Sequence, residues 1–325
     1  MPREPFRAGR QFAQLMDSMG LGKQGNCDLM ADRAPARPFE ILTPSVWSAP
    51  VIFNSPHSGR WYGEDFLRLT RLSPAALRKS EDCYVDELFM GCLAHGAPML
   101  RAHAPRSYID LNREPYELDP RMFAGDLPGY VNTNSPRVAG GLGTLPRIVA
   151  EGQEIYRGRI DFAEALSRIE RIYLPYHRTL AALVDEVQKN NGAMLLIDCH
   201  SMPSSALAHI APAPFGTIDV VLGDRFGVSC DEAVTCLVEQ HFTGHGLRVM
   251  RNKPYAGGFI THTHGGPEHG RHALQIEINR ALYLNETTLE KTRDFAALQA
   301  TLTSVIAALL TEIEARFSPH RLAAE

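Results

Sequence analysis

Short apolar runs that end in polar residues recur along this chain. The apolar run at 195–197 leads directly into a polar stretch that contains His200, and another apolar run carries Glu277 inside it. A third run, at 51–54, is followed by a turn that contains His57. Short apolar runs bounded by turn residues are typical of buried strands. We therefore predict three strands that bring His57, His200 and Glu277 to or near their carboxyl ends.

Patterns typical of helices separate these strands. Apolar residues recur at helical spacing in 81–93, in 161–187 with a break near Pro175, in 231–242, and in 287–317 with a break near Leu302. Alternating strands and helices predict a mostly parallel sheet covered by helices on both faces. The expected fold class is therefore α/β, with a mostly parallel central sheet.

Several shorter elements complete this prediction. We expect further strands at 39–42, 98–101, 218–222 and 248–250, and a strand within 105–115 that ends in Asp-x-Asn-Arg. Ser73-Pro74 is a favourable start for a helix, because serine caps the first turn and proline fits its first position. Gly192 is expected to end the helix that precedes the central strand.

The domain organisation is predicted to be simple. Residues 1–36 are mixed in charge and end in a proline-rich stretch, so we expect a flexible N-terminal arm. Residues 37–320 are expected to form a single catalytic α/β domain. The N-terminus lacks the apolar region of a secretory signal, and we expect neither a membrane-spanning helix nor a membrane partner.

Composition and charge narrow the class of protein. The chain of 325 residues is 44% hydrophobic and 22% charged, with a net charge of -4, which disfavours nucleic acid and anionic membranes as partners. A small anionic substrate remains compatible with a local arginine pocket. The six cysteines form no C-x-x-C pair and no disulfide framework, which indicates a reducing, cytoplasmic location. The sequence leaves a homo-oligomer open.

The three strand ends predict a metal centre. Residues that end parallel strands meet at one edge of the sheet, so His57, His200 and Glu277 are expected to converge. Two imidazoles and a carboxylate form the usual protein ligand set of a catalytic zinc, which lowers the pKa of a bound water to about 7. Glu277 alternates with Ile276 and Ile278, so it faces away from them and could serve as general base.

Other interpretations stay open from the residues alone. Each histidine could be an ordinary turn residue, and Glu277 could simply pair with a neighbouring arginine such as Arg280. Asp82 and Asp86 are predicted to share one helix face, where they could complement the helix dipole or, for Asp82 above all, point into a cleft. Cys199 could act as a nucleophile, although a cysteine inside a strand is usually a small buried apolar residue.

Two further groups of side chains have alternative interpretations. The adjacent Asn112 and Arg113 offer a planar fork that suits a carboxylate, although Arg113 could also be an ordinary surface arginine. Four histidines surround glycines without a fixed ligand spacing, so we expect them to lie in loops: His262, His264, His269 and His272.

Taken together, these motifs resemble the N-formylglutamate amidohydrolase family. The matching segments are Asn-Ser-Pro-His-Ser-Gly at 54–59, Glu-Asp-x-x-Val-Asp-Glu-Leu-Phe at 81–89, Ile-Asp-Leu-Asn-Arg at 109–113, Asp-Cys-His-Ser at 198–201, Asn-x-Pro-Tyr-Ala-Gly-Gly-Phe at 252–259 and Leu-Gln-Ile-Glu-Ile-Asn at 274–279. The resemblance extends from about residue 48 to 285 with the motifs in the same order. It implies a fold similar to that of zinc carboxypeptidases: a three-layer α/β/α sandwich around a mixed, mostly parallel central sheet of about eight strands.

The resemblance also implies a ligand set for one divalent metal ion, for which zinc is expected. His57 and His200 would be two ligands. Carboxypeptidases have a glutamate three residues after the first histidine, whereas this chain has Arg60 there. The third ligand must therefore come from elsewhere. Asp82 is the first choice, and Glu81 and Asp86 are the alternatives.

The remaining roles follow from the same resemblance. Glu277 would be the general base and Arg106 would stabilise the oxyanion. Four residues would bind substrate: Asn112, Arg113, Asn252 and Tyr255. The implied reaction is hydrolysis of an N-acyl acidic amino acid, with N-formyl-L-glutamate as the expected substrate. The alternatives are a deacylase or small peptidase with the same zinc chemistry, a metal-free ligand-binding homologue, and a cysteine hydrolase that uses Cys199.

Overall fold

The structure is a computed structural model that describes residues 37–149, 152–208 and 217–317. The predicted N-terminal arm, residues 1–36, lies outside the described residues. The expectation of a single domain over 37–320 stays a prediction.

The centre of the molecule is a sheet whose seven strands combine both pairing directions. Their order is β1 (Phe39–Leu42), β3 (Met99–Ala102), β2 (Val51–Ser55), β4 (Met194–Met202), β7 (Arg271–Asn279), β5 (Val220–Gly223) and β6 (Val249–Arg251). The pairs β1–β3 and β5–β7 are antiparallel, and the other four pairs are parallel. The predicted mixed, mostly parallel sheet is confirmed, with seven strands in the described residues where about eight were expected.

The register of β4 and β7 places the polar residues of both strands on one face. His200 pairs with Glu277, and Asp198 pairs with Gln275. Because side chains alternate across a strand, these four residues point to the same side. The residues that alternate with them, such as Cys199 and Ile276, pack into the core on the opposite side.

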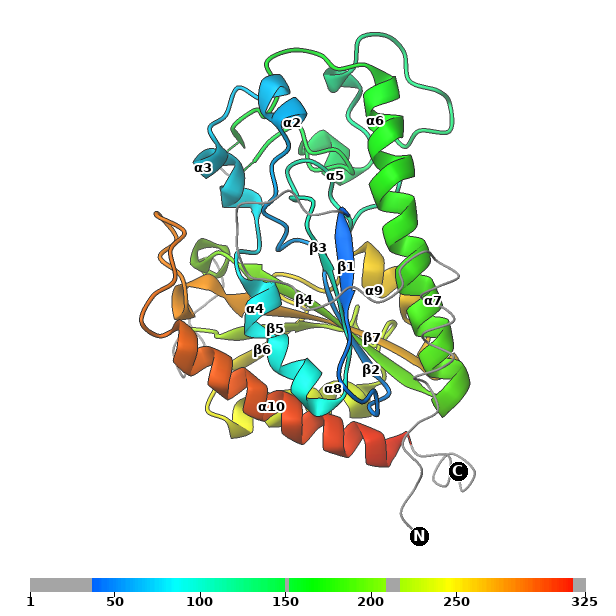
Figure 1. Ribbon diagram of the computed structural model, residues 1–325, viewed down its shortest axis with the longest axis vertical. Helices are drawn as coiled ribbons and strands as arrows, with labels where there is room; N and C mark the ends of the chain where they lie inside the picture. Colours follow the sequence, from blue (N-terminus) through cyan, green and yellow to red (C-terminus); the bar gives the residue numbers. More distant parts are fainter. Residues whose placement is uncertain (1–36, 150–151, 209–216, 318–325) are drawn as a thin grey trace.

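Helices cover both faces of the sheet (Figure 1). One face packs against α4 (Val85–Leu88), α8 (Glu232–Gly244) and α10 (Phe295–Arg316). The other face packs against α7 (Leu174–Asn191), which continues from α6 (Phe162–Arg168) through a π-helical segment, Ile169–Tyr173. The break predicted near Pro175 corresponds to this segment, since proline lacks the N–H that a regular helix needs. The three-layer α/β/α prediction is confirmed.

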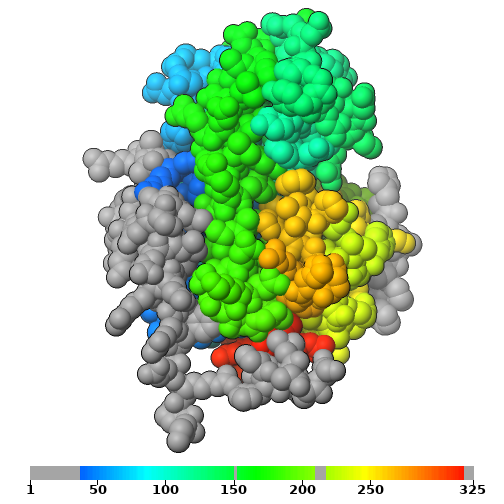
Figure 2. All heavy atoms as spheres, turned by 90° about the vertical axis from the view of Figure 1, so that its right-hand side faces the viewer, coloured from blue at the N-terminus to red at the C-terminus, as the bar shows by residue number. Residues whose placement is uncertain are grey.

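The short helices lie mainly in the connections at the carboxyl edge of the sheet. Helices α2 (Glu64–Leu69), α3 (Pro74–Leu77) and α5 (Pro136–Ala139) gather at one end of the molecule (Figure 1). Helix α9 (Phe259–His264) precedes β7. Figure 2 shows the face that carries α6 and α7, with the segment of α9 beside them. As predicted, the Ser73 side chain caps α3, and Gly192 ends α7 with φ of 80°.

Three predicted elements differ from the structure. Residues 81–93 form only the short helix α4 and a following 3₁₀ segment, because Tyr84 adopts a left-handed conformation with φ of 62°. Residues 105–115 form turns and no strand, since the backbone N–H of Asn112 is bonded by the Asp110 side chain at 2.9 Å. The last helix begins at Phe295, later than expected, and runs unbroken past Leu302.

Helix α10 owes its apolar composition to the core. Among the described residues it is the one helix that is long and apolar enough to cross a membrane. Leu302, Val305, Leu309 and Ile313 are each almost fully buried and pack against the sheet. A helix that fills the core of a globular protein passes the same test of length and composition.

Candidate metal centre

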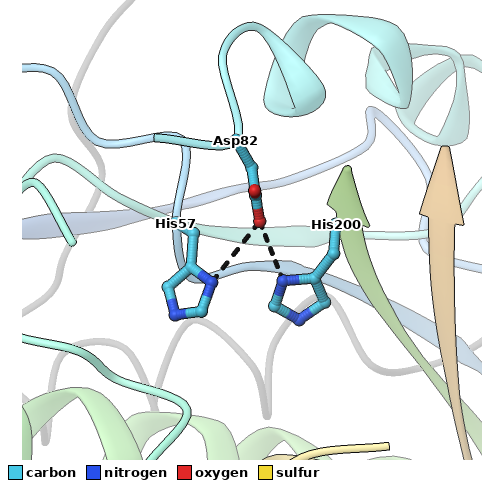
Figure 3. A group of neighbouring side chains, drawn as sticks. All are labelled: His57, Asp82 and His200. Atoms are coloured by element: carbon cyan, nitrogen blue, oxygen red, sulfur yellow. Dashed lines mark hydrogen bonds and ion pairs between the residues drawn. The ribbon is translucent and has the colours of Figure 1, made fainter. Parts of the chain in front are cut away.

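Three buried side chains converge where β2 and β4 approach the carboxyl edge of the sheet (Figure 3). His57 lies just after β2, His200 lies in β4, and Asp82 lies in the turn before α4. One potential ligand atom from each residue lies within 4.8 Å of the others. The two imidazole rings are 4.9 Å apart between centroids. The predicted meeting of these residues, which are distant in sequence, is therefore present.

The geometry of this group fits a divalent cation. Oδ2 of Asp82 lies 2.9 Å from Nδ1 of His200 and 3.4 Å from Nδ1 of His57. His57 Nδ1 is a buried nitrogen without a hydrogen-bond partner in the described part of the chain. A buried polar atom is normally satisfied, and a metal ion would satisfy this one. Two nitrogens and one oxygen form a ligand set that suits zinc and leaves one position for water.

The other side of Asp82 is anchored. Oδ1 of Asp82 accepts a hydrogen bond from Arg280 at 2.9 Å and one from the Ser201 hydroxyl at 3.4 Å. Arg280 therefore pairs with Asp82, which argues against the alternative that it simply neutralises Glu277. Since Oδ1 is held in this way, Asp82 presents Oδ2 to the two imidazoles.

Two carboxylates that the sequence analysis missed lie behind the histidines. His57 Nε2 is 2.7 Å from Oδ1 of Asp110, and His200 Nε2 is 2.9 Å from Oδ2 of Asp198. A carboxylate that accepts Nε2–H fixes the ring and leaves the Nδ1 lone pair for a metal. One signal was available in the sequence: Asp198 precedes His200 by two residues and so shares its face of the strand.

A chain of buried hydrogen bonds connects Asp198 to α7. Asn54 donates to Oδ1 of Asp198 at 2.7 Å, and the hydroxyl of Tyr176 donates to Oδ1 of Asn54 at 2.5 Å. All three side chains are fully buried. Asp198 is therefore fixed by the second strand and by a helix on the far side of it.

Charge and burial act against each other in this group. Burial disfavours ionisation of both Asp82 and His200. For Asp82, hydrogen bonds from His200 and His57 outweigh burial and hold its pKa well below the usual value. For His200, the charge and hydrogen bond of Asp198, followed by the bond to Asp82, outweigh burial and hold its pKa well above the usual value. The Asp82 carboxylate thus favours a positive charge on His200, and His200 favours a negative charge on Asp82. A dication between them would take the place of the proton on Nδ1.

The alternative third ligands point to other partners. Glu81 accepts from the hydroxyl of Tyr62 at 2.5 Å and from Arg78 at 3.2 Å. Asp86 accepts from Arg101 at 3.0 Å. The predicted shared helix face of Asp82 and Asp86 is wrong, because Asp82 lies before the helix begins. Of the three acids, the geometry favours Asp82.

The surroundings of Glu277 shift the pKa of its carboxyl group. It pairs in register with His200 on the neighbouring strand, and it accepts a hydrogen bond from Gln275 at 2.8 Å. Burial, together with the negative charge of Asp82, raises its pKa to about 7, although His200 and nearby arginines oppose the shift. A carboxylate with this pKa can exchange protons near neutral pH.

Arg106 and Tyr255 lie within the electrostatic field of the same group. Nε of Arg106 donates to Oδ2 of Asp110 at 2.9 Å. Burial opposes its charge, but Asp110, Asp82 and Glu277 raise its pKa. Burial also raises the pKa of Tyr255, with a further contribution from Glu277. Their predicted roles in oxyanion stabilisation and substrate binding stay predictions.

The other predicted substrate residues are already engaged. Asn112 lies 3.2 Å from both Asp198 and Nε2 of His200, and its Oδ1 accepts from the backbone N–H of Ile260 at 2.8 Å. Arg113 donates to the carbonyls of Leu142 and Asn112. The predicted Asn-Arg fork is therefore not free in this conformation, and substrate binding by these residues stays a prediction.

Asn252 is held on the side of β5. Its amide bonds to Asp224 at 2.7 Å, and its Oδ1 accepts from the backbone N–H of Asp224 at 3.2 Å. These contacts bridge the ends of β5 and β6. A substrate contact by Asn252 stays a prediction and would require these bonds to be released.

The buried thiol and the clustered histidines do not join the centre. Cys199 packs into the core on the face opposite to His200, and burial raises the pKa of its thiol well above the usual value. A thiolate nucleophile is therefore disfavoured. The prediction that the clustered histidines lie in loops is wrong for His262 and His264, which lie on α9, and for His272, which lies on β7.

Comparisons with known proteins agree with this architecture. The family model described as "N-formylglutamate amidohydrolase" matches residues 49–284. Two N-formylglutamate deformylases are 28% identical to the chain. The one from Pseudomonas aeruginosa aligns over 260 residues, 76% of this chain and 86% of the relative. The one from Pseudomonas putida aligns over 242 residues, 73% of this chain and 83% of the relative.

One solved structure supports the family and a second supports the fold. The crystal structure of N-formylglutamate amidohydrolase from Ralstonia eutropha is 35% identical, covers 85% of this chain and 98% of its own, and superposes with a TM-score of 0.79. A protein from Agrobacterium tumefaciens, 18% identical with a TM-score of 0.60, shares the fold; the match covers 86% of this chain and 97% of that one. The chain belongs to the N-formylglutamate amidohydrolase family.

Proposed function

We propose that this chain hydrolyses N-formyl-L-glutamate to formate and L-glutamate with one divalent metal ion, for which zinc is expected. The observation that carries the proposal is the convergence of Nδ1 of His57, Nδ1 of His200 and Oδ2 of Asp82, with each imidazole backed by a carboxylate. The names of the related enzymes supply the substrate.

The chemistry divides between the ion and the side chains. A divalent ion bound by His57, Asp82 and His200 supplies Lewis-acid activation of water and of the formyl carbonyl. Glu277 accepts a proton from the attacking water and then gives it to the nitrogen of the departing amino acid. A pKa of about 7 suits Glu277 to both steps, because the side chain can take and release a proton at neutral pH.

Arg106 is positioned for the charge that develops during the attack. Its guanidinium is oriented by Asp110, the same carboxylate that holds His57. A donor aimed at the developing oxyanion typically contributes roughly 3 kcal/mol to transition-state stabilisation. This orientation prepares the donor before the substrate arrives.

The direct test is a formate-release assay with and without a chelator. We expect formate from N-formylglutamate, loss of activity with chelator, and recovery when zinc is restored. N-Acetylglutamate and dipeptides assayed in parallel would identify a deacylase or peptidase of the same type. Activity that survives complete metal removal would refute the metal-dependent mechanism, and metal analysis of the purified protein checks the ion.

The partner is a small anionic N-acyl amino acid. A cytoplasmic location agrees with the five cysteines of the described residues, which are free thiols.

A further inference from the structure

A cavity of about 670 Å³ is lined in part by Gly258, the neighbour of Asn112, and has no role in the reaction described above. It lies between the segment 114–137 and the start of α9. In Figure 2 the teal segment that includes 114–137 lies directly above the orange segment that includes α9. The side chains that matter for its chemistry are Glu114, Glu117, Asn132, Ser135, Arg137 and Arg225.

A single side chain separates this cavity from a metal ligand. Gly258 lines the cavity, and a Cβ atom on it would lie 2.4 Å from the amide of Asn112. The same amide lies 3.2 Å from Nε2 of His200. The absence of a side chain at Gly258 therefore leaves room for the Asn112 amide, which contacts both Gly258 on the cavity wall and His200.

Arg225 reaches the cavity past the neighbouring glycine. Its backbone N–H donates to the carbonyl of Ala256 at 2.7 Å, and its Cγ would be 2.8 Å from a Cβ at Gly257. Gly257 has φ of 122°, which side chains rarely tolerate, so this position favours glycine on both counts. The two glycines thus accommodate Arg225 on one side and Asn112 on the other.

The two arginines of the cavity are half-buried and, among the described residues, lack an acidic partner. Nε of Arg225 is buried and has no hydrogen-bond partner among the described residues. Within the same part of the chain, neither Arg137 nor Arg225 forms an ion pair with an acid. By contrast, Arg106, Arg113 and Arg280 nearer the metal centre all face carboxylates.

The acids of the cavity are held by their own neighbours. Glu114 accepts from the amide of Asn132 at 2.9 Å, and Glu117 accepts from the hydroxyl of Ser135. They therefore remain on the wall formed by 114–135 and do not pair with the arginines. A ligand carboxylate would be attracted to the arginine side and repelled from the side of Glu114 and Glu117.

We propose that Arg225, assisted by Arg137, binds the side-chain carboxylate of a dicarboxylic N-formyl amino acid and so determines the specificity of the enzyme. The inference rests on the proposed function and extends it. A guanidinium binds a carboxylate through two parallel N–H groups, and Arg225 lines the cavity without an acid among the described residues that already pairs with it. In glutamate, the side-chain carboxylate is five bonds from the formyl carbon, roughly 6 Å when extended.

The test compares two substrates of nearly equal shape in the zinc-loaded, full-length protein. N-Formylglutamate carries the side-chain charge, and N-formylglutamine replaces it with an amide. For Arg225→Gln we expect kcat/KM for N-formylglutamate to fall about 10- to 100-fold, mainly through KM, because a hydrogen bond to a charged group is lost. N-Formylglutamine should change by less than about 3-fold. Arg225→Lys should recover part of the loss, and Arg137→Gln should give a smaller loss with the same selectivity.

The control is Arg293→Gln, which removes an arginine whose side chain is 95% exposed. It should leave both substrates unaffected. Equal losses on both substrates for Arg225→Gln, or an unchanged KM for N-formylglutamate, would overturn the specificity role. If the wild-type protein hydrolyses neither substrate, the proposed function fails instead. Calorimetric binding of N-formylglutamate to the wild-type and Arg225→Gln proteins would then still decide whether Arg225 holds the carboxylate.

Discussion

Substitution of Asp110 by asparagine tests whether the carboxylates behind the histidines prepare the metal site. Asp110 accepts from Nε2 of His57 at 2.7 Å, and both side chains are 2% exposed. The asparagine keeps the shape but removes the charge that favours Nε2–H and directs the Nδ1 lone pair inward. Loss of such a partner typically weakens metal binding 10- to 100-fold, which corresponds to about 1.4 to 2.7 kcal/mol.

The assay is a competition for zinc between the apo-protein and a chromophoric chelator. Asp119→Asn is the matched control, because Asp119 is also buried and pairs with two arginines, Arg121 and Arg147, in another part of the molecule. It should cost stability without altering zinc affinity. Should Asp110→Asn bind zinc within about 3-fold of the wild type, the bond to Nε2 does not orient His57 and the reasoning fails.

Three further predictions concern the role of Glu277, its protonation, and the packing of α10. Glu277→Gln should keep zinc at full occupancy but lose about 10²- to 10⁴-fold in kcat, and near-native turnover would remove Glu277 from the mechanism. Because burial raises the pKa of Glu277 to about 7 and a base must be deprotonated, kcat/KM should fall as the pH drops below about 7. A bound cation would move this midpoint lower, and Glu277→Gln should abolish this limb in a pH–rate profile; a limb that persists in the variant belongs to another group. Leu302→Ala should lower the free energy of unfolding by about 2 to 5 kcal/mol in denaturant titrations, whereas Leu142→Ala, at a side chain that is 42% exposed, should change it by less than about 1 kcal/mol. Equal effects of the two leucine substitutions would contradict the packing assigned to α10.

The sequence predicted those features that depend on local pattern. Apolar runs located the strands of His57, His200 and Glu277, and the alternation of Glu277 with two isoleucines gave its face. The parallel topology then placed the three residues together without knowledge of any contact. Asp82 was preferred to Asp86 because it lies nearer the start of the predicted helix and could point into a cleft, and in the structure it lies before α4 begins.

The features that the sequence did not predict depend on distant contacts. Asp110 and Asp198 matter because of hydrogen bonds to His57 and His200, and no local pattern encodes the first of these bonds. The helix expected from residue 81 was wrong because the left-handed Tyr84 interrupts an otherwise helical spacing. A turn of this kind is determined by the surrounding packing, which periodicity alone does not report.

Hydrogen bonds run from Tyr176 on α7 through Asn54 to Asp198, which holds His200. They connect the helix layer of α7 to the metal site. By thermodynamic linkage, whatever holds Asp198 in place for the ion must in turn be held more firmly once the ion is bound. Zinc should therefore slow amide hydrogen exchange along α7, a helix that contributes no ligand. Substitutions of the buried residues that pack against α7 would then change the affinity for the ion without altering any group that contacts the substrate.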